Sequence, residues 1–366
     1  MQRKKSGWML LTVASILLAT GCGRRPYETP IVTNSQQPDK ELFDRAVGDI
    51  ERSRFTIARL TLQTLINTYP DSEFIAKAKL AIADTWFREG GSSNLMQAEA
   101  EYRDFITFFP TLPEASEAQM RVAMIHYQEM EKPDRDPTHA RRAEQEFQKI
   151  LLNYPDSPFA PLAEQRLREV QEVLAQGTFE VGRFYFLQGN DIATQARLKE
   201  LVDRYPNFSQ ADGALYLLGR SLERSGEKMM AEAIPYYSRI VRNYPLGSRA
   251  KDAKERLAAL GATVPEPDPA AVVRMTYENA LAQQQGLFAK LLGGFGRRPN
   301  VLAAQGKLGA PTMTTQGPAQ AGAVSPAVQS QQSPTSGASP SQTIFLEPVP
   351  DSNTTSTPTN PPPSNP

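Results

Sequence analysis

Apolar residues between positions 39 and 262 recur in a register that repeats five times. Counting back from five prolines that each follow an aromatic residue, a small residue stands 12 positions earlier, and larger apolar residues stand 8, 5 and 1 positions earlier. Steps of four, three and four place these residues on one face of an α-helix. The five sets are Ala58, Leu62, Leu65 and Tyr69; Ala98, Tyr102, Phe105 and Phe109; Ala143, Phe147, Ile150 and Tyr154; Thr194, Leu198, Leu201 and Tyr205; and Ala233, Tyr237, Ile240 and Tyr244.

Each aromatic–proline pair predicts the end of a helix, because proline lacks the amide donor and clashes with the preceding turn. The five prolines are spaced by 40, 45, 51 and 39 residues. A Ser or Thr that could cap a following helix comes soon after each one. These capping candidates are Ser72, Thr111, Ser157, Ser209 and Ser248. The repeating unit is therefore predicted to be a pair of antiparallel helices.

The pattern of a small residue, two larger ones and an aromatic–proline pair resembles the second helix of the tetratricopeptide repeat, whose usual period is about 34 residues. Insertions such as 131–138 lengthen the connection between the two helices of a unit. The fold class implied is all-α, a right-handed superhelical solenoid of five tetratricopeptide-like pairs over 39–262, with a groove suited to peptides or protein segments. The aromatics before the prolines are expected to lie between helices rather than to contact ligands.

Two further regions follow the repeats. Asp268 and Pro269 are typical of a helix start, and helical spacing of apolar residues continues to Gly293, so 263–298 is expected to hold a helix that caps the solenoid or docks on a partner or on lipid. Residues 299–366 contain 13 of the 30 prolines and only three charged residues, so we expect a disordered Pro/Ser/Gln-rich tail.

The first 21 residues have the form of a secretory signal. Arg3, Lys4 and Lys5 precede an uncharged apolar stretch over 8–19, which is too short to span a bilayer. The sequence Leu18-Ala-Thr-Gly-Cys22 then resembles the lipobox of bacterial lipoproteins, which implies cleavage between Gly21 and Cys22 and a lipid on Cys22.

An ordinary signal followed by an incidental thiol is the alternative. Cys22 is the only cysteine, so it has no partner for an internal disulfide, and lipidation explains both its number and its place. Residues 22–38 then form a short lipidated linker to a membrane surface. Gly23, at the place where Asp directs retention in the inner membrane of enterobacteria, favours the outer membrane.

Charge and composition narrow the chemistry. The chain has 40 basic and 40 acidic residues, and removal of the three basic residues of the signal leaves 37 against 40, which argues against a nucleic-acid partner. The two histidines, His126 and His139, are expected to be a packing residue and a solvent-facing one, and a metal centre is not expected. Neighbouring carboxylates such as Glu144 and Glu146 are expected on a solvated surface, so we predict no catalytic residues, no enzyme activity and no cofactor beyond the lipid.

Four local stretches support a more specific resemblance: Tyr69-Pro-Asp-Ser-Glu-Phe74, Tyr154-Pro-Asp-Ser-Pro-Phe159, Phe179-Glu-Val-Gly-Arg-Phe-Tyr-Phe186 and Ala214-Leu-Tyr-Leu-Leu-Gly219. With the lipobox and the five units, they resemble the BamD family, lipoproteins of the outer-membrane β-barrel assembly machine. The resemblance implies a scaffold anchored on the periplasmic face of the outer membrane. Its carboxy-terminal repeats would hold the barrel-forming subunit, its amino-terminal repeats would receive unfolded outer-membrane protein segments, and other assembly lipoproteins would be further partners.

Other classes of function remain open at this stage. A periplasmic tetratricopeptide lipoprotein could instead act in cell-division envelope coordination or in pilus and secretin assembly. A helical module associated with a murein hydrolase is the weakest alternative, because about 70 residues of disorder cannot supply a catalytic domain.

Overall fold

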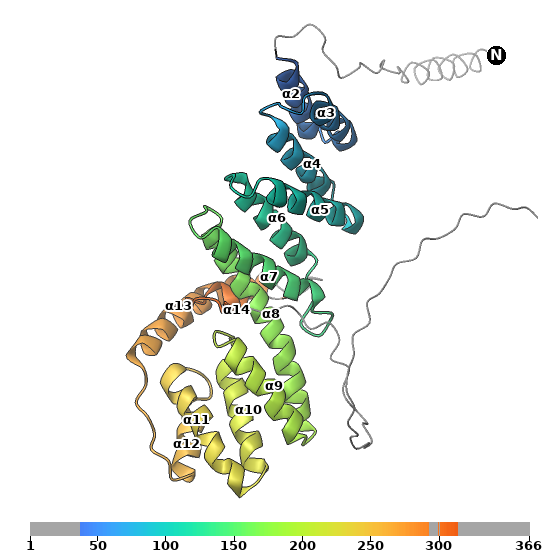
Figure 1. Ribbon diagram of the computed structural model, residues 1–366. Coiled ribbons are helices and arrows are strands. Elements are labelled where there is room, and N and C mark those ends of the chain that lie inside the picture. Colours follow the sequence, from blue (N-terminus) through green and yellow to red (C-terminus); the bar gives the residue numbers. More distant parts are fainter. Residues whose placement is uncertain (1–36, 293–298, 300, 314–366) are drawn as a thin grey trace, which may run out of the picture. The chain divides into compact units, whose positions relative to one another are not determined.

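The computed structural model describes residues 37–292, 299 and 301–313, and these ranges contain helices and connections but no strand (Figure 1). The helices are α2 (Pro38–Glu51), α3 (Phe55–Thr68), α4 (Ile75–Glu89), α5 (Ser92–Phe108), α6 (Glu114–Gln128), α7 (Thr138–Asn153), α8 (Ala160–Leu187), α9 (Asp191–Arg204), α10 (Ala211–Arg224), α11 (Glu227–Asn243), α12 (Ala250–Ala259), α13 (Pro269–Leu292) and α14 (Leu302–Gln305). The all-α prediction is confirmed for the described ranges.

Each helix from α2 to α11 packs against the next one in the chain, and α11 packs against α12. The five predicted units correspond to α2–α3, α4–α5, α6–α7, α8–α9 and α10–α11, which form a tetratricopeptide-like solenoid (Figure 1). The spacing of 51 residues between the third and fourth prolines is explained by α8, which is 28 residues long.

The aromatic residue before each proline ends the second helix of its unit through backbone hydrogen bonds. The amide of Tyr69 donates to the carbonyl of Leu65 at 2.9 Å, and the carbonyl of Tyr69 accepts from the amide of Ser72 at 3.1 Å. Equivalent pairs of bonds occur at Phe109, Tyr154, Tyr205 and Tyr244. The repeated aromatic–proline signal is therefore a recurring tight turn.

The capping role predicted for the serines is wrong in its detail. Ser72 Oγ accepts from the amide of Phe74 at 3.1 Å, and Ser157 Oγ accepts from that of Phe159 at 3.0 Å, but Phe74 and Phe159 themselves stand at the N-cap positions of α4 and α8. The serines brace the turn ahead of the helix. The turn uses extra residues after each proline, so the helices begin later than a direct serine cap would allow.

Small residues let the paired helices approach closely. A Cβ atom at Gly182 of α8 would lie 2.4 Å from Leu198 Cδ2 of α9, and one at Gly219 of α10 would lie 2.6 Å from Tyr237 Cζ of α11. A large residue of the repeated register therefore packs directly against each of these glycines. The first helix of a unit thus contributes a small residue that the register of the second helix does not include.

The helix expected between 263 and 298 is present as α13, and its start agrees with the prediction. Asp268 Oδ1 accepts from the amide of Ala270 at 2.9 Å, and the Asp268 amide donates to the Arg242 carbonyl at 3.0 Å, near the end of α11. Arg274 also donates to the Asn243 carbonyl at 2.9 Å. These contacts attach the first turns of α13 to α11, and whether the rest of it stabilises the solenoid or docks elsewhere stays a prediction.

The boundary predicted for the disordered tail is too early. Residues 301–313 are ordered: Val301 packs against the apolar core that extends from α6 to α12, and α14 contacts α8. Composition misled the prediction because this stretch is held by backbone hydrogen bonds and small residues rather than by the large apolar side chains that composition detects.

Candidate protein-binding surface

The residues of the repeated register form the interior of the solenoid. The fully or almost fully buried ones are Ala58, Leu62, Leu65, Ala98, Tyr102, Phe105, Ala143, Phe147, Ile150, Thr194, Leu198, Leu201, Tyr205, Ala233, Tyr237 and Ile240. Tyr69, Phe109, Tyr154 and Tyr244 are half-buried and pack at the edges of the same clusters. None of these side chains offers a large free surface, so a binding site must use other residues.

The predicted processing and lipidation positions, Gly21 and Cys22, lie outside the described residues. Within the ranges that the structure describes, no helix is long and apolar enough to cross a membrane.

A cavity of about 670 Å³ opens beside α8, in the third and fourth units. Its walls come from α7, α8, α9 and the connection that precedes α7. Val173 and Leu174 are buried at this site, whereas the Phe184 side chain is 56% exposed. Gly177 lets the connection pass over α8, because a Cβ atom there would lie 2.6 Å from the carbonyl oxygen of Pro133. An apolar surface is thus accessible inside a concave site.

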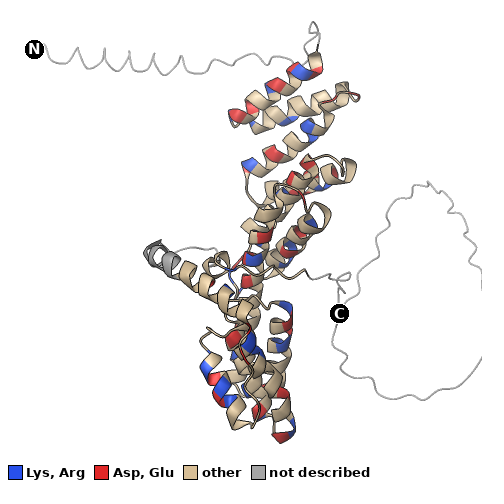
Figure 2. Cartoon of the chain, turned by 90° about the vertical axis from the view of Figure 1, so that its left-hand side faces the viewer, with Lys and Arg blue, Asp and Glu red and all other residues tan. Residues whose placement is uncertain are grey.

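Charged groups of both signs surround this apolar surface. The basic residues are Lys132, Arg135, Arg141, Arg197 and Arg204, and the acidic ones are Glu131, Asp134, Asp136, Glu180 and Glu200. Figure 2 shows basic and acidic residues interspersed over the helices in the same way. A mixed rim can orient a polypeptide partner through complementary charges, while the apolar surface supplies contact area.

Arg204 lines the cavity and also contacts a buried carboxylate. It donates to Glu144 Oε2 at 3.0 Å, and Glu144 is only 2% exposed. Burial raises the pKa of Glu144, while Arg204 and the amide of Gln171 oppose that shift. The carboxylate therefore holds Arg204 in place at the edge of the cavity.

Glu146 lies on a different side of α7 and contacts the preceding unit. Its carboxylate accepts from Arg103 at 2.8 Å, from Gln119 at 2.7 Å and from Lys149 at 2.9 Å. Burial opposes ionisation of Glu146, but the hydrogen bonds from Arg103 and Lys149 outweigh it and hold its pKa below the usual value.

The expectation of a solvated surface is therefore wrong for both carboxylates. Glu144 and Glu146 are buried because each receives charged partners from a neighbouring unit. The two carboxylates point to different sides of α7, because they share none of these partners.

The two histidines also differ from expectation as a pair. His126 is buried, as predicted for a packing residue, but His139 lies against it with their Nδ1 atoms 3.3 Å apart. The contact could not be predicted from the sequence, because the long connection 129–137 separates α6 from α7 and does not fix which of their residues meet. Among the described residues, no group of three His, Cys, Asp or Glu side chains could hold a metal ion.

Buried tyrosine–carboxylate pairs were missed from the sequence. Tyr102 in the second unit donates to Asp84, and Tyr237 at the equivalent place in the fifth unit donates to Glu223 at 2.8 Å. Burial raises the pKa of Tyr102 and of Tyr237, and the nearby carboxylates add to the shift. A tyrosine at the register position 8 before the proline, with an acidic residue late in the preceding helix, is the signal that could have revealed them.

The family model YfiO, described as outer membrane lipoprotein, matches residues 35–234. The chain belongs to the YfiO family of outer membrane lipoproteins. The BamD resemblance inferred from the sequence is thereby confirmed, and the match spans the first four units, the cavity and the beginning of α11.

Relatives from several organisms are similar to this member of the YfiO family. "Outer membrane protein assembly factor BamD" of Caulobacter vibrioides is 22% identical over 60% of this chain and 71% of the relative. Proteins of the same name from Vibrio cholerae, 23% identical over 63% of this chain and 96% of the relative, and from Neisseria meningitidis, 22% identical over 61% and 86%, are also similar. A solved structure, "Crystal structure of MamA protein", covers 63% of this chain and 100% of its own at 13% identity and a TM-score of 0.25, which is too low to bear on the fold.

Proposed function

We propose that this chain is an assembly factor for outer-membrane proteins that binds its partners and does not convert them chemically. The match to the YfiO family over residues 35–234 carries the proposal, since that region contains the cavity and most of the solenoid. The names of the relatives support it, because each is an outer-membrane protein assembly factor. In this role the chain is a scaffold of the β-barrel assembly machine that holds the barrel-forming subunit.

The anchor in this proposal is a lipid on Cys22, on the periplasmic face of the outer membrane. Residues 23–37 would join it to α2, which begins at Pro38. A linker of about fifteen residues keeps the solenoid within a few nanometres of the bilayer. Other assembly lipoproteins of the machine would bind the scaffold on the same periplasmic face of the outer membrane.

The cavity beside α8 suits an unfolded client segment. Such a segment alternates apolar and polar residues, and the cavity combines an apolar surface with a rim of both charges. Binding there needs no chemical energy, because burial of an apolar side chain against Phe184 and Val181 is itself favourable.

Co-purification from solubilised outer membranes tests the scaffold and the anchor together. The intact chain should recover the barrel-forming subunit, while Cys22→Ala should leave the membrane fraction because nothing else anchors it in this proposal. Recovery of only peptidoglycan enzymes or a pilus secretin would instead support the cell-division or pilus alternative and overturn the assembly role.

Crosslinking of an unfolded outer-membrane protein to the full chain tests the cavity. Phe184→Asp places a charge on its apolar surface and should reduce crosslinking at least fivefold, whereas Ile192→Asp is the matched control, since Ile192 is 83% exposed and does not line the cavity. Equal crosslinking of both variants would exclude the cavity as the client site but would leave recovery of the barrel-forming subunit as a separate result.

A further inference from the structure

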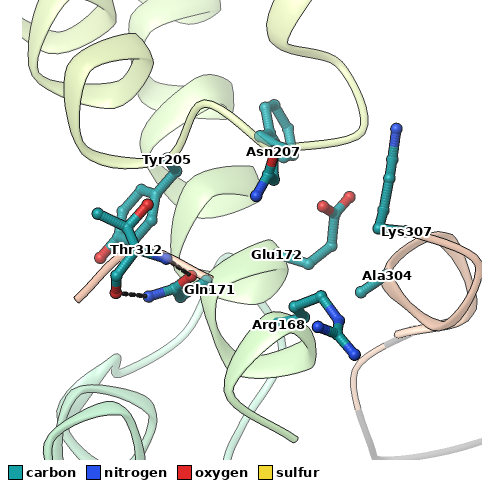
Figure 3. Close-up of a pocket in the computed structure, with 9 residues that line it drawn as sticks. Arg168, Gln171, Glu172, Tyr205, Asn207, Ala304, Lys307 and Thr312 are labelled. Atoms are coloured by element: carbon teal, nitrogen blue, oxygen red, sulfur yellow. Dashed lines mark hydrogen bonds between the residues drawn. The ribbon is translucent and has the colours of Figure 1, made fainter. Parts of the chain in front are cut away.

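The stretch after α14, which is neither helix nor strand and bends at Gly309, lies against α8 and the turn after α9, and Figure 3 shows its Thr312 beside Gln171. Gln171 of α8 makes two hydrogen bonds to one residue of this stretch: its Nε2 donates to the Thr312 carbonyl at 2.7 Å, and its Oε1 accepts from the Thr312 amide at 3.0 Å. Gln148 of α7 donates to the same carbonyl at 3.1 Å. Asn207 donates to the Ala310 carbonyl at 2.6 Å. Side-chain amides thus bind backbone groups of the segment at two positions, Ala310 and Thr312.

The amide groups that bind the segment are buried and held by rigid helices. Gln171 is 6% exposed and Gln148 is 7% exposed. Gln171 also donates to Glu144 Oε1 at 3.2 Å, and Glu144 is fixed by Arg204. The contacts with Glu144 and Arg204 orient the Gln171 amide without using the segment, and the amide bonds to backbone groups rather than to one particular side chain.

Two positions of the segment are nevertheless selective for side-chain size. A Cβ atom at Gly309 would lie 2.4 Å from Asn207 Oδ1, so a larger residue would move the Asn207 side chain away from the Ala310 carbonyl that it binds. Pro311 is buried, and the space left beside the segment, lined by Phe208, Glu172 and Lys307 among others, measures about 10 Å³. That volume is about one water molecule, so the segment fills its site.

Hydrophobic burial contributes little to holding the segment. Its large apolar side chains are exposed, Leu308 by 54% and Met313 by 40%. Its charged contact is between Lys307 Nζ and Glu278 Oε2 of α13 at 3.1 Å, and the Leu308 amide donates to the other oxygen of Glu278 at 3.2 Å. A segment held mainly by backbone hydrogen bonds can leave more easily than a packed helix, because each such bond is replaced by one to water.

We propose that Gln148, Gln171 and Asn207 form a binding site for the backbone of an irregular polypeptide segment, and that the chain's own residues 307–313 are its resting occupant. A segment of another molecule with the same chemistry would compete for the site. That chemistry is a mostly uncharged stretch with glycine two residues before a buried proline.

Hydrogen exchange on the full chain tests the resting contact. The Thr312 amide should exchange at least tenfold more slowly than in the free peptide of residues 304–313, because Gln171 holds it. Gln171→Ala should abolish that protection. Gln176→Ala is the matched control on the same helix, since Gln176 contacts Glu180 and Gln210 instead. Free exchange in the wild type, or full protection in Gln171→Ala, would overturn the proposal.

Binding in trans tests whether the site accepts another chain. A fluorescent peptide of residues 304–313 is titrated against the full chain and against the full-length Gly309→Val variant, whose own segment should be released more easily because it loses the Asn207 hydrogen bond to Ala310. The variant should bind the peptide at least tenfold more tightly than the wild type does. Adding Gln171→Ala to the variant, or placing Gly309→Val in the peptide, should remove binding, while adding Gln176→Ala should not.

Circular dichroism establishes that each variant keeps its helices before the titration is read. Equal binding to wild type and Gly309→Val, or binding that survives Gln171→Ala, would overturn the proposal. So would failure of Gly309→Val to bind the peptide once hydrogen exchange shows that its own segment is released.

Discussion

The amino-terminal units, α2 to α5, and the central units, α6 to α9, follow one apolar register but bury different kinds of residue around it. In the amino-terminal units the core consists of residues such as Leu42, Leu62 and Ile82, and Asp49 is the buried charged residue. In the central units four glutamates are buried together with three glutamines. These residues, which together form the central polar layer, are Gln119, Glu144, Glu146, Gln148, Glu169, Gln171 and Glu172.

The difference separates the residues that pair the helices in every unit from the residues that are particular to the central units. Apolar burial at the register positions is sufficient to pair helices in both regions. Buried charges do not by themselves add stability over apolar residues, but removing one partner is costly, so they favour one arrangement of neighbours over others. The cavity and the segment-binding site both adjoin the central polar layer, through Arg204 and Gln171.

The largest expected effect tests what the two regions share. Phe147→Ala in the centre should lower the free energy of unfolding by about 3–5 kcal/mol and Leu62→Ala in the amino-terminal units by about 2–5 kcal/mol, because both side chains are fully buried. Leu152→Ala is the control, since Leu152 lies on the same helix as Phe147 but is 65% exposed. Urea denaturation followed by circular dichroism measures all three. A negligible effect of Leu62→Ala would mean that the amino-terminal units contribute no stability of their own.

The next effect tests the polar layer of the centre. Glu146→Ala should cost about 3 kcal/mol, the lower end for a broken buried ion pair, because Arg103 and Lys149 are partly exposed and can reach water. Asp104→Ala, at an exposed position on α5, should change little. The same urea denaturation measures both variants. If Glu146→Ala were as mild as Asp104→Ala, the buried layer would not distinguish the two regions energetically.

The elements of the solenoid could be predicted because their signal is local and repeated. A residue such as Tyr69 or Tyr205 ends its helix through bonds within its own turn, so the register alone locates the second helix of each unit. The serines after each proline misled the prediction of helix starts, because Ser72 and Ser157 bond to the turn rather than to the first helical amides.

The candidate sites could not be predicted because their contacts join residues far apart in the chain. Gln171 and Thr312 are 141 residues apart, and Glu144 and Arg204 are 60 apart. A carboxylate on an amphipathic helix is usually solvated, so only the neighbouring unit reveals that Glu144 is buried. The order of residues 301–313 was also not predicted. Their composition is that of a disordered segment, and the contacts that hold them come from residues far away in the chain.

A smaller effect compares the two tyrosine–carboxylate pairs. Tyr102→Phe should cost about 1.5–2 kcal/mol, because Asp84 would lose its hydrogen-bond donor while burial already raises its pKa. Tyr237→Phe should cost about 1 kcal/mol, because Glu223 keeps Arg256 as a donor. Thermal unfolding of the two variants measures the difference. The reverse order would show that arginine does not replace the tyrosine hydroxyl at Glu223.

The smallest effect is a dependence on pH that arises at His126 in the centre, where both histidines of the chain lie. Burial lowers the pKa of His126, and His139 and Arg142 act in the same direction against Glu99 and Glu146. The folded state therefore favours the neutral ring. Its contribution to stability is complete above the unfolded pKa of about 6.5 and is lost as the pH falls below that value toward the lower folded pKa.

Thermal unfolding between pH 7.5 and 5 measures this loss. The wild type should become less stable on acidification, and His126→Phe should show a shallower decline, because the ring that must take up a proton is gone. Burial raises the pKa of Glu144 and Glu172, so proton uptake by these carboxylates favours the folded state and opposes the loss at His126 equally in both proteins. An equal slope in His126→Phe and wild type would mean that the acid sensitivity does not arise at His126.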